Sequence, residues 1–192
     1  MLEEKTSFWA LVIDVVETVV VAAAIFVVVY LFLLQPHQVK GASMKPNFHD
    51  GEYILTDKVS YRFSEPQRGD VIIFKSPTDP DVDFIKRIIA LPGERVKIAG
   101  GKVTIFNDQN PNGLTLNEPY QTNGSTSAGK EAPDNTEVTI DKDEYFVLGD
   151  NRVESFDSRS WGALPKKNII GKAWLRYWPF SKLGFVKHYQ YK

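Results

Sequence analysis

The chain has 192 residues, which suits one membrane-spanning helix and one domain large enough for a sizeable core. Its 23 Lys and Arg residues balance 24 Asp and Glu residues, and a net charge of −1 argues against a nucleic-acid-binding protein. Cysteine is absent, which excludes disulfides and thiolate chemistry, and the histidines His37, His49 and His188 lack metal-ligand spacing, so we expect no metal site and no histidine-based triad.

The N-terminal part contains one long apolar run, from residue 9 to residue 34, after a polar and slightly acidic stretch at 1–8. Residues 18–34 carry no charge and would span about 26 Å as a helix, slightly less than the ~30 Å hydrocarbon core of a bilayer. Asp14 and Glu17 would lie at one interface. The pattern therefore predicts a transmembrane helix over residues 9–34.

This helix is predicted to be an uncleaved signal-anchor. Its N-terminal flank is acidic, its apolar segment is longer than that of a signal peptide, and no small-x-small cleavage site follows it. Pro36 ends the helix, because proline disfavours helical geometry in the residue before it. The few flanking lysines do not specify an orientation in the membrane.

Residues 35–192 show short strand patterns separated by Gly, Pro and Asn turns, and no internal repeat. The region is therefore predicted to be mostly β. Strands are expected at residues 52–56, 71–74, 84–91, 94–98, 102–106, 136–140, 145–148, 169–177 and 185–191. Residues 107–135 are rich in Asn, Gly, Ser, Thr and Pro and are predicted to form a loop-rich insertion.

An aromatic cluster occurs late in the chain. We interpret it first as part of the core, and alternatively as a surface that rests in a membrane interface, where Trp and Tyr are favoured. Its members are Trp174, Tyr177, Trp178, Phe180 and Phe185.

Two stretches contain residues that could form a nucleophile and its base. Ser43 lies in Val-Lys-Gly-Ala-Ser-Met-Lys-Pro, just after the anchor, although an isolated serine is usually a solvated or turn residue. Lys86 and Arg87 lie on an apolar strand that points them to opposite faces. A strand lysine is usually a surface charge, but a buried lysine has a lowered pKa and can take a proton from a serine. Arginine cannot, because it stays charged.

A third stretch, residues 149–162, crowds several polar groups into a few positions. A guanidinium can hold a carboxylate rigidly, and a hydroxyl can orient a neutral amine. Taken alone, the stretch is a structured turn with a surface ion pair of little energetic value. The groups are Asp150, Ser155, Asp157 and Arg159.

Four motifs in this order resemble bacterial type I signal peptidases, the Ser-Lys membrane endopeptidases, in their smaller Gram-positive form. They are Ser-Met-Lys-Pro at 43–46, Arg-Gly-Asp-Val-Ile-Ile-Phe at 68–74, Lys-Arg-Ile-Ile-Ala-Leu-Pro-Gly at 86–93, and the Gly-Asp-Asn-Arg to Ser-x-Asp-Ser-Arg stretch at 149–159. The resemblance implies a single N-terminal transmembrane helix followed by an all-β catalytic domain. It also implies a serine endopeptidase that removes signal peptides from secreted preproteins through an acyl-enzyme, cutting after small residues at the first and third positions before the cut.

The resemblance assigns roles residue by residue. Ser43 would be the nucleophile, Lys86 the general base, and Ser155 the hydroxyl that hydrogen-bonds and positions the Lys86 amine. Asp157 and Arg159, together with Asp150, would form a supporting ion-pair network. Positions near the substrate-binding cleft correspond to Val39, Met44, Phe84 and Ile85. No metal or cofactor is implied.

The resemblance also implies a location. The protein would be a single-pass protein of the cell membrane, with residues 1–8 cytoplasmic and residues 35–192 on the extracytoplasmic face. Its partners would be secreted preproteins and the lipid bilayer, with no nucleic acid. Two residues depart from the family pattern: Asn47 stands where many members have threonine, and Gly41 where some have a serine that assists the oxyanion. A backbone N–H, chiefly that of Ser43, would then form the oxyanion hole.

Two alternatives remain open from the sequence. The same dyad on a β scaffold resembles self-cleaving SOS-response repressors, but these lack a membrane anchor. A catalytically inactive anchored homologue could bind signal peptides without cutting them, although such a protein should have lost Ser43 or Lys86.

Overall fold

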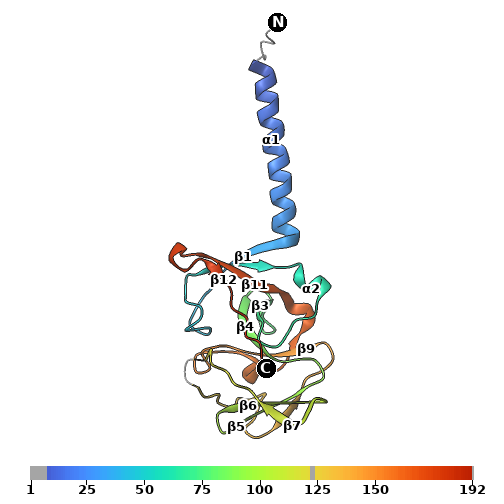
Figure 1. Cartoon of the computed structure of the whole chain (residues 1–192), viewed down its shortest axis with the longest axis vertical. Coiled ribbons are helices and arrows are strands. Elements are labelled where there is room, and N and C mark those ends of the chain that lie inside the picture. The colour runs from blue at the N-terminus through green and yellow to red at the C-terminus, as the bar shows by residue number, and fades with distance from the viewer. Residues whose placement is uncertain (1–7, 122–123, 192) are drawn as a thin grey trace.

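The computed structural model describes residues 8–121 and 124–191, and it consists of a long helix that leads into a β-rich body (Figure 1). Helix α1 (Phe8–Val28) has no buried residue and continues as the π-helical segment η1 (Val29–Leu33). Within the described residues, α1 is the one helix long and apolar enough to cross a membrane. The helical stretch thus ends at Leu33, and the chain passes directly into strand β1 (Leu34–Gln38).

Strand β1 contains Pro36 and was not expected from the sequence. It is tolerated because β1 is an edge strand, which pairs only with β2 among the described strands. The larger sheet has the order β1-β2-β11-β3-β4-β9-β10, with β12 added on β11, and its pairings are antiparallel. Its further strands are β2 (Tyr53–Asp57), β3 (Val71–Lys75), β4 (Asp83–Ala90), β9 (Glu144–Leu148), β10 (Leu164–Pro165), β11 (Ile169–Trp178) and β12 (Gly184–Phe185).

The smaller sheet has the order β7-β6-β5-β8 and lies at the end of the body away from α1 (Figure 1). Gly100 and Gly101 form the β5–β6 turn with positive φ angles of 55° and 77°, as the hairpin prediction requires. The strands are β5 (Arg95–Ala99), β6 (Lys102–Asn107), β7 (Asn110–Thr115) and β8 (Glu137–Thr139). Short helices complete the fold: α2 (Ser60–Phe63), α3 (Ser158–Trp161), η2 (Lys166–Asn168) and η3 (Phe180–Lys182).

Two strand predictions were wrong. Residues 110–115 were expected in a loop because of their Asn, Pro and Gly content, yet they form β7, since Leu114 pairs with Ile105 and packs on the core. Conversely, the strand expected at 185–191 is limited to β12. The rest of that segment crosses the body and donates a hydrogen bond from Tyr189 N to Gly69 O at 3.2 Å.

Strand β4 lies at the centre of the packing. Ile85, Ile88 and Ile89 belong to three different clusters of buried apolar side chains, so this strand links the floor of the cleft to the interior of both sheets. Burial of one such isoleucine contributes about 1.5–3 kcal/mol. The mostly β architecture with an N-terminal apolar helix is confirmed.

The aromatic cluster is not core, so the first interpretation of it was wrong. Trp174 and Trp178 are 40% and 46% exposed, and Phe180 and Phe185 at least 70%. Strand β12 pairs with β11 only at Leu175 and Arg176, and the rings pack on one another in pairs, Trp174 on Phe185 and Trp178 on Phe180, while staying exposed.

Candidate active site

Ser43 lies on a tight loop that begins immediately after β1. Gly41 takes a left-handed conformation (φ 84°), and its N–H donates to Asp50 Oδ1 at 2.7 Å. Met44, 1% exposed, anchors the loop in the core. The Ser43 carbonyl accepts a hydrogen bond from Asn151 N at 3.0 Å. The serine is therefore held from both sides.

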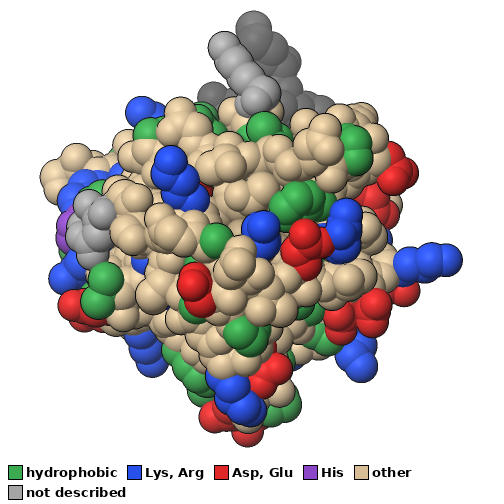
Figure 2. All heavy atoms as spheres, turned by 90° about the horizontal axis from the view of Figure 1, so that it is seen from below, with side chains coloured by type: hydrophobic (Ala, Val, Ile, Leu, Met, Phe, Trp, Pro, Cys, Tyr) green, Lys and Arg blue, Asp and Glu red, His purple; other side chains and the backbone are tan. Residues whose placement is uncertain are grey.

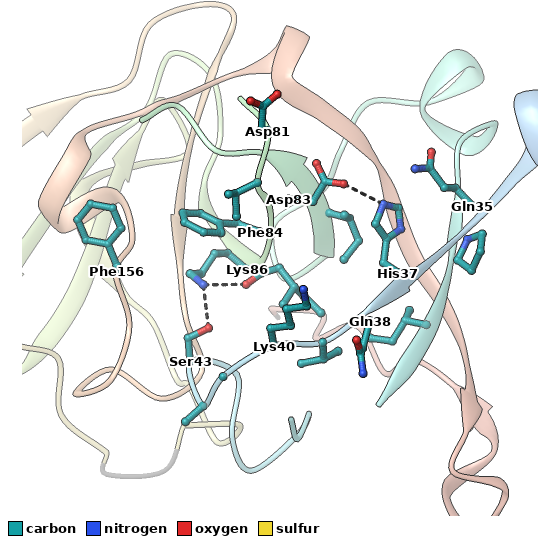
Figure 3. Close-up of a pocket in the computed structure, with 18 of the residues that line it drawn as sticks. Gln35, His37, Gln38, Lys40, Ser43, Asp81, Asp83, Phe84, Lys86 and Phe156 are labelled. Atoms are coloured by element: carbon teal, nitrogen blue, oxygen red, sulfur yellow. Dashed lines mark hydrogen bonds and ion pairs between the residues drawn. The ribbon is translucent and has the colours of Figure 1, made fainter. Parts of the chain in front are cut away.

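Lys86 reaches Ser43 from the middle of β4. Its Nζ lies 2.8 Å from Ser43 Oγ and 3.0 Å from the Ile85 carbonyl (Figure 3). The residue is only 4% exposed, and its Nζ lies 5.3 Å from the centre of the Phe84 ring. Burial lowers the pKa of Lys86 to about 8, while the negative charges of Asp157 and Asp150 act in the opposite direction. A neutral amine is thus accessible near neutral pH.

Arg87 points to the opposite side of β4, as strand alternation requires. Its Nε and Nη2 donate to Asp150 Oδ1 and Oδ2, both at 2.8 Å, and its Nη1 donates to Gly69 O at 2.8 Å. Its guanidinium also stacks 4.2 Å from the Tyr120 ring. Asp150 was expected in one ion-pair network with Asp157 and Arg159, whereas its ion-pair partner is Arg87.

Asp157 and Arg159 form a separate buried ion pair. Arg159 Nε and Nη2 each contact the Asp157 carboxylate at 2.8 Å, and Asp157 also accepts from Gly149 N at 3.1 Å. Arg159 Nη2 donates further to the Arg152 carbonyl at 2.7 Å. The pair therefore fixes the loop that joins β9 to α3 and that carries Ser155.

Ser155 makes no hydrogen bond to Lys86, contrary to the role expected for it. Its Oγ is buried and has no hydrogen-bond partner among the described residues. It lies so close to Gly149 that a Cβ there would come within 2.3 Å of Ser155 Oγ and 2.4 Å of the Ser43 carbonyl oxygen. In this structure the Lys86 amine is held by Ser43 and its own neighbour Ile85.

Further side chains support the site beyond those expected to do so from the sequence. Asn47 Nδ2 donates to Asp150 Oδ2 at 2.8 Å and to the Tyr120 carbonyl at 2.9 Å. Arg152 contacts the Glu118 carboxylate with Nη2 and Nη1 at 2.5 and 3.1 Å. Glu118 and Tyr120 belong to the 107–135 insertion, whose composition gave no sign of such a role. Asn47 was noted from the sequence as a departure beside the nucleophile, but its contacts with Asp150 and Tyr120 were not expected.

A cleft of about 660 Å³ opens beside the Ser43–Lys86 pair, between the end of β1 and the start of β4 (Figure 3). Three of the four residues expected near a substrate, Val39, Phe84 and Ile85, line it. The fourth, Met44, packs beneath it in the same apolar cluster as Val39 and Ile85. The described residues contain no group of three or more His, Asp or Glu side chains able to hold a metal ion.

A serine hydroxyl 2.8 Å from a buried amine of lowered pKa, at the edge of an open cleft, has the geometry of a serine hydrolase with an amine base. The family model described as signal peptidase, peptidase S26, matches residues 12–178. The chain belongs to this family, and it is therefore a serine peptidase. The resemblance found from the motifs is confirmed, and the repressor alternative is set aside.

Similar proteins come from diverse organisms. Signal peptidase I of Leptolyngbya laminosa is 35% identical over 178 residues, covering 88% of this chain and 81% of the relative. Signal peptidase IB of Staphylococcus aureus is 31% identical over 184 residues, covering 88% and 92%. A crystal structure of a signal peptidase I from Enterococcus faecalis is 31% identical, covers 57% of this chain and 97% of its own, and has a TM-score of 0.45.

Proposed function

We propose that this protein is a membrane-anchored endopeptidase that removes N-terminal signal peptides from secreted preproteins. Ser43 is the nucleophile and Lys86 the general base. The observation that carries the proposal is the 2.8 Å contact between Ser43 Oγ and a lysine Nζ that is buried and whose pKa is lowered. The steps below use the chain's own side chains and backbone, the substrate and one water molecule.

The neutral Lys86 amine takes the proton of Ser43 Oγ as Oγ bonds to the scissile carbonyl carbon, whose oxygen becomes an oxyanion. Collapse of this intermediate breaks the C–N bond, and the Lys86 ammonium returns its proton to the leaving amine. The product is an ester between Ser43 and the signal peptide. Water then attacks the ester, again with Lys86 as base, and restores the free hydroxyl.

The supporting residues hold this geometry. The Ser43 N–H is the proposed oxyanion donor, since the Gly41 N–H is already used by Asp50. Asp150 acts through Arg87 and Asn47, while Asp157 and Arg159 fix the 149–159 loop against the Ser43 carbonyl. Ser155 Oγ lies beside that carbonyl and has no hydrogen-bond partner among the described residues, so it is available to orient the amine or the substrate.

The substrate binds as an extended strand between β1 and β4. On this side β4 is free over residues 83–86, because β9 pairs only with residues from Arg87 onward. The floor of the cleft near Ser43 is formed by Val39 and Ile85, which leaves room for small side chains at the first and third positions before the cut.

The membrane contributes through proximity, because enzyme and substrate share one surface. Helix α1 is the proposed anchor, with residues 1–8 cytoplasmic and the β-rich body outside. Strand β12 and the part of β11 next to it lie at the same end of the body as α1 (Figure 1), and the aromatic side chains of β11, η3 and β12 are exposed. The opposite face carries interspersed acidic and basic side chains with only scattered apolar ones (Figure 2). This asymmetry favours the membrane-interface interpretation of the aromatic cluster.

The test is cleavage of a purified preprotein by the full chain in detergent or lipid vesicles, with the cut located by intact mass. We expect cleavage after a small-x-small sequence, and none with Ser43→Ala, Lys86→Ala or Lys86→Arg. Normal cleavage by any of these variants would refute the dyad. Binding without cleavage by folded wild-type protein would favour the inactive homologue instead.

A further inference from the structure

The cleft has a polar end that the proposed reaction does not use. His37 of β1 and Asp83 of β4 meet there across the cleft, with His37 Nε2 3.3 Å from Asp83 Oδ2 (Figure 3). Thr56 Oγ1, 2.8 Å from His37 Nδ1, fixes the orientation of the imidazole ring. The His37 side chain is 11% exposed and the Asp83 side chain 32%. The carboxylate therefore keeps part of its surface for another partner.

The floor of the cleft changes character between Ser43 and this pair. His37 and Val39 are two positions apart, as are Asp83 and Ile85, so each pair points to one side of its extended segment. Near Ser43 the two walls present Val39 and Ile85, which belong to one apolar cluster. Two residues further from Ser43 along each wall, the side chains are polar on both sides, His37 on β1 and Asp83 on β4.

The polar end is the one nearer the membrane helix, because β1 follows η1 without a linker (Figure 1). A substrate segment that leaves the bilayer beside α1 meets His37 and Asp83 before it reaches Ser43. An extended segment places side chains of one face about 7 Å apart. One such side chain lies over the apolar floor, and the next one away from the cut reaches the polar pair.

The chemistry of the pair selects what can lie on it. A carboxylate has about four acceptor positions, and His37 Nε2 contacts only one of the two Asp83 oxygens. A hydroxyl, amide or ammonium group can donate to the other positions. A leucine or phenylalanine side chain would instead displace water from the carboxylate without donating a hydrogen bond to replace those lost.

Building on the proposed function, we propose that His37 and Asp83 form a specificity-determining pair. It accepts a hydrogen-bond-donating side chain a few residues before the cut and excludes the large apolar side chains of the substrate's membrane segment. The pair thereby holds the boundary between the apolar and polar parts of the substrate at a fixed place in the cleft. This boundary determines which peptide bond lies at Ser43.

The test uses full-chain enzyme and a set of preproteins that carry Ser, Lys or Leu singly at position two or at positions four to six before the cut, with small residues kept at positions one and three. For wild-type enzyme we expect kcat/KM at one position to be at least about tenfold lower for Leu than for Ser or Lys, mainly through KM. Asp83→Asn should reduce the advantage of Lys, and His37→Phe should raise cleavage of the Leu substrate. Asp108→Asn, an exposed turn substitution in the other sheet, is the control and should change neither.

Equal kcat/KM for all three residues at every position would overturn the inference while leaving the proposed function intact. So would a wild-type preference that survives unchanged in both variants. If His37→Phe fails to fold, Asp83→Asn, a nearly isosteric change at a partly exposed site, decides alone. A wild-type enzyme that cleaves none of the substrates would refute the proposed function itself.

Discussion

Arg87 holds Asp150 through two parallel hydrogen bonds of 2.8 Å, and both side chains are almost completely buried. The pair links two parts of the site, because Arg87 follows Lys86 in β4 and Asp150 precedes Asn151, whose N–H supports the Ser43 carbonyl. The base and the nucleophile are thus connected through a second contact besides their own.

Replacement of Arg87 by lysine should destabilise the protein despite the conserved charge. Lysine cannot reproduce the fork that binds both Asp150 oxygens and the Gly69 carbonyl, and we expect a loss of about 2–4 kcal/mol in the free energy of unfolding. Chemical denaturation of the full chain measures it. Arg95→Lys, in an exposed ion pair with Glu137, should cost less than about 1 kcal/mol, and equal losses would contradict the argument.

The rate of cleavage should depend on the charge state of Lys86. Because burial lowers the pKa of Lys86 to about 8, the neutral amine is the minor form below pH 8. We expect single-turnover rates to rise about tenfold per pH unit at acidic pH and to level off above about pH 8. A midpoint near the ordinary lysine pKa would show that the amine is not desolvated in the working enzyme.

The same burial should make Lys86 costly for stability. The folded-state pKa lies below that of the unfolded chain, so the unfolded chain binds more protons between about pH 8 and 10.5, and stability rises with pH through that window. Below pH 8 the penalty is fully present. Lys86→Met should therefore stabilise the inactive protein by about 3 kcal/mol at pH 7. The gain should shrink to under about 1 kcal/mol at pH 10, and a gain independent of pH would point to packing instead.

Replacement of Asn47 by alanine should destabilise the protein less than replacement by aspartate. Asn47→Ala removes two hydrogen bonds, to Asp150 and to the Tyr120 carbonyl, and should cost about 1–3 kcal/mol. Asn47→Asp places a second carboxylate where the amide lay 2.8 Å from Asp150, so two negative charges meet in a partly buried site. Thermal unfolding should show Asn47→Asp below Asn47→Ala at pH 7.5, with the difference narrowing at pH 5. A constant difference would rule out charge repulsion as its cause.

Gly149 should not accept any side chain. A Cβ would lie 2.4 Å from the Ser43 carbonyl oxygen and 2.3 Å from Ser155 Oγ, so the nucleophile loop must move. A shift of about 1 Å at a nucleophile can cost 10²-fold, and we expect Gly149→Ala to lose at least tenfold in kcat/KM. Gly184→Ala is the matched control, since nothing lies within 4 Å of its Cβ position. Similar activity of the two variants would contradict a steric role for Gly149.

Local patterns predicted the elements of this fold better than its long-range pairings. Strand alternation correctly sent Lys86 and Arg87 to opposite sides of β4. It could not identify Asp150 as the partner of Arg87, because the two are 63 positions apart and the nearer Arg159 offered an equally suitable guanidinium. The role of Glu118 was hidden for the same reason, since a single acid in a polar insertion looks like any solvated charge.

The aromatic cluster shows a different limit. A run of apolar residues predicts that their side chains are removed from water. It does not show whether they lie in the interior of the protein or at a membrane interface. The rings of Trp178 and Phe180 pack edge to face with their centroids 4.9 Å apart, and both side chains remain exposed to solvent. Ser155 illustrates a third case, because a motif fixes which residue is present without fixing which hydrogen bond its side chain makes.

The direct connection from η1 to β1 limits how far the β-rich body can move relative to helix α1. No flexible linker separates them, and the Lys58 N–H binds the Leu33 carbonyl at 3.0 Å, which fastens the end of the helix to the strand next to β1. With α1 attached rigidly to the β-rich body, the active site cannot move far relative to the helix. If α1 spans the membrane as proposed, the active site is held at one height above the membrane plane, and we expect folded proteins that carry a suitable sequence in a surface loop at another height to remain uncut.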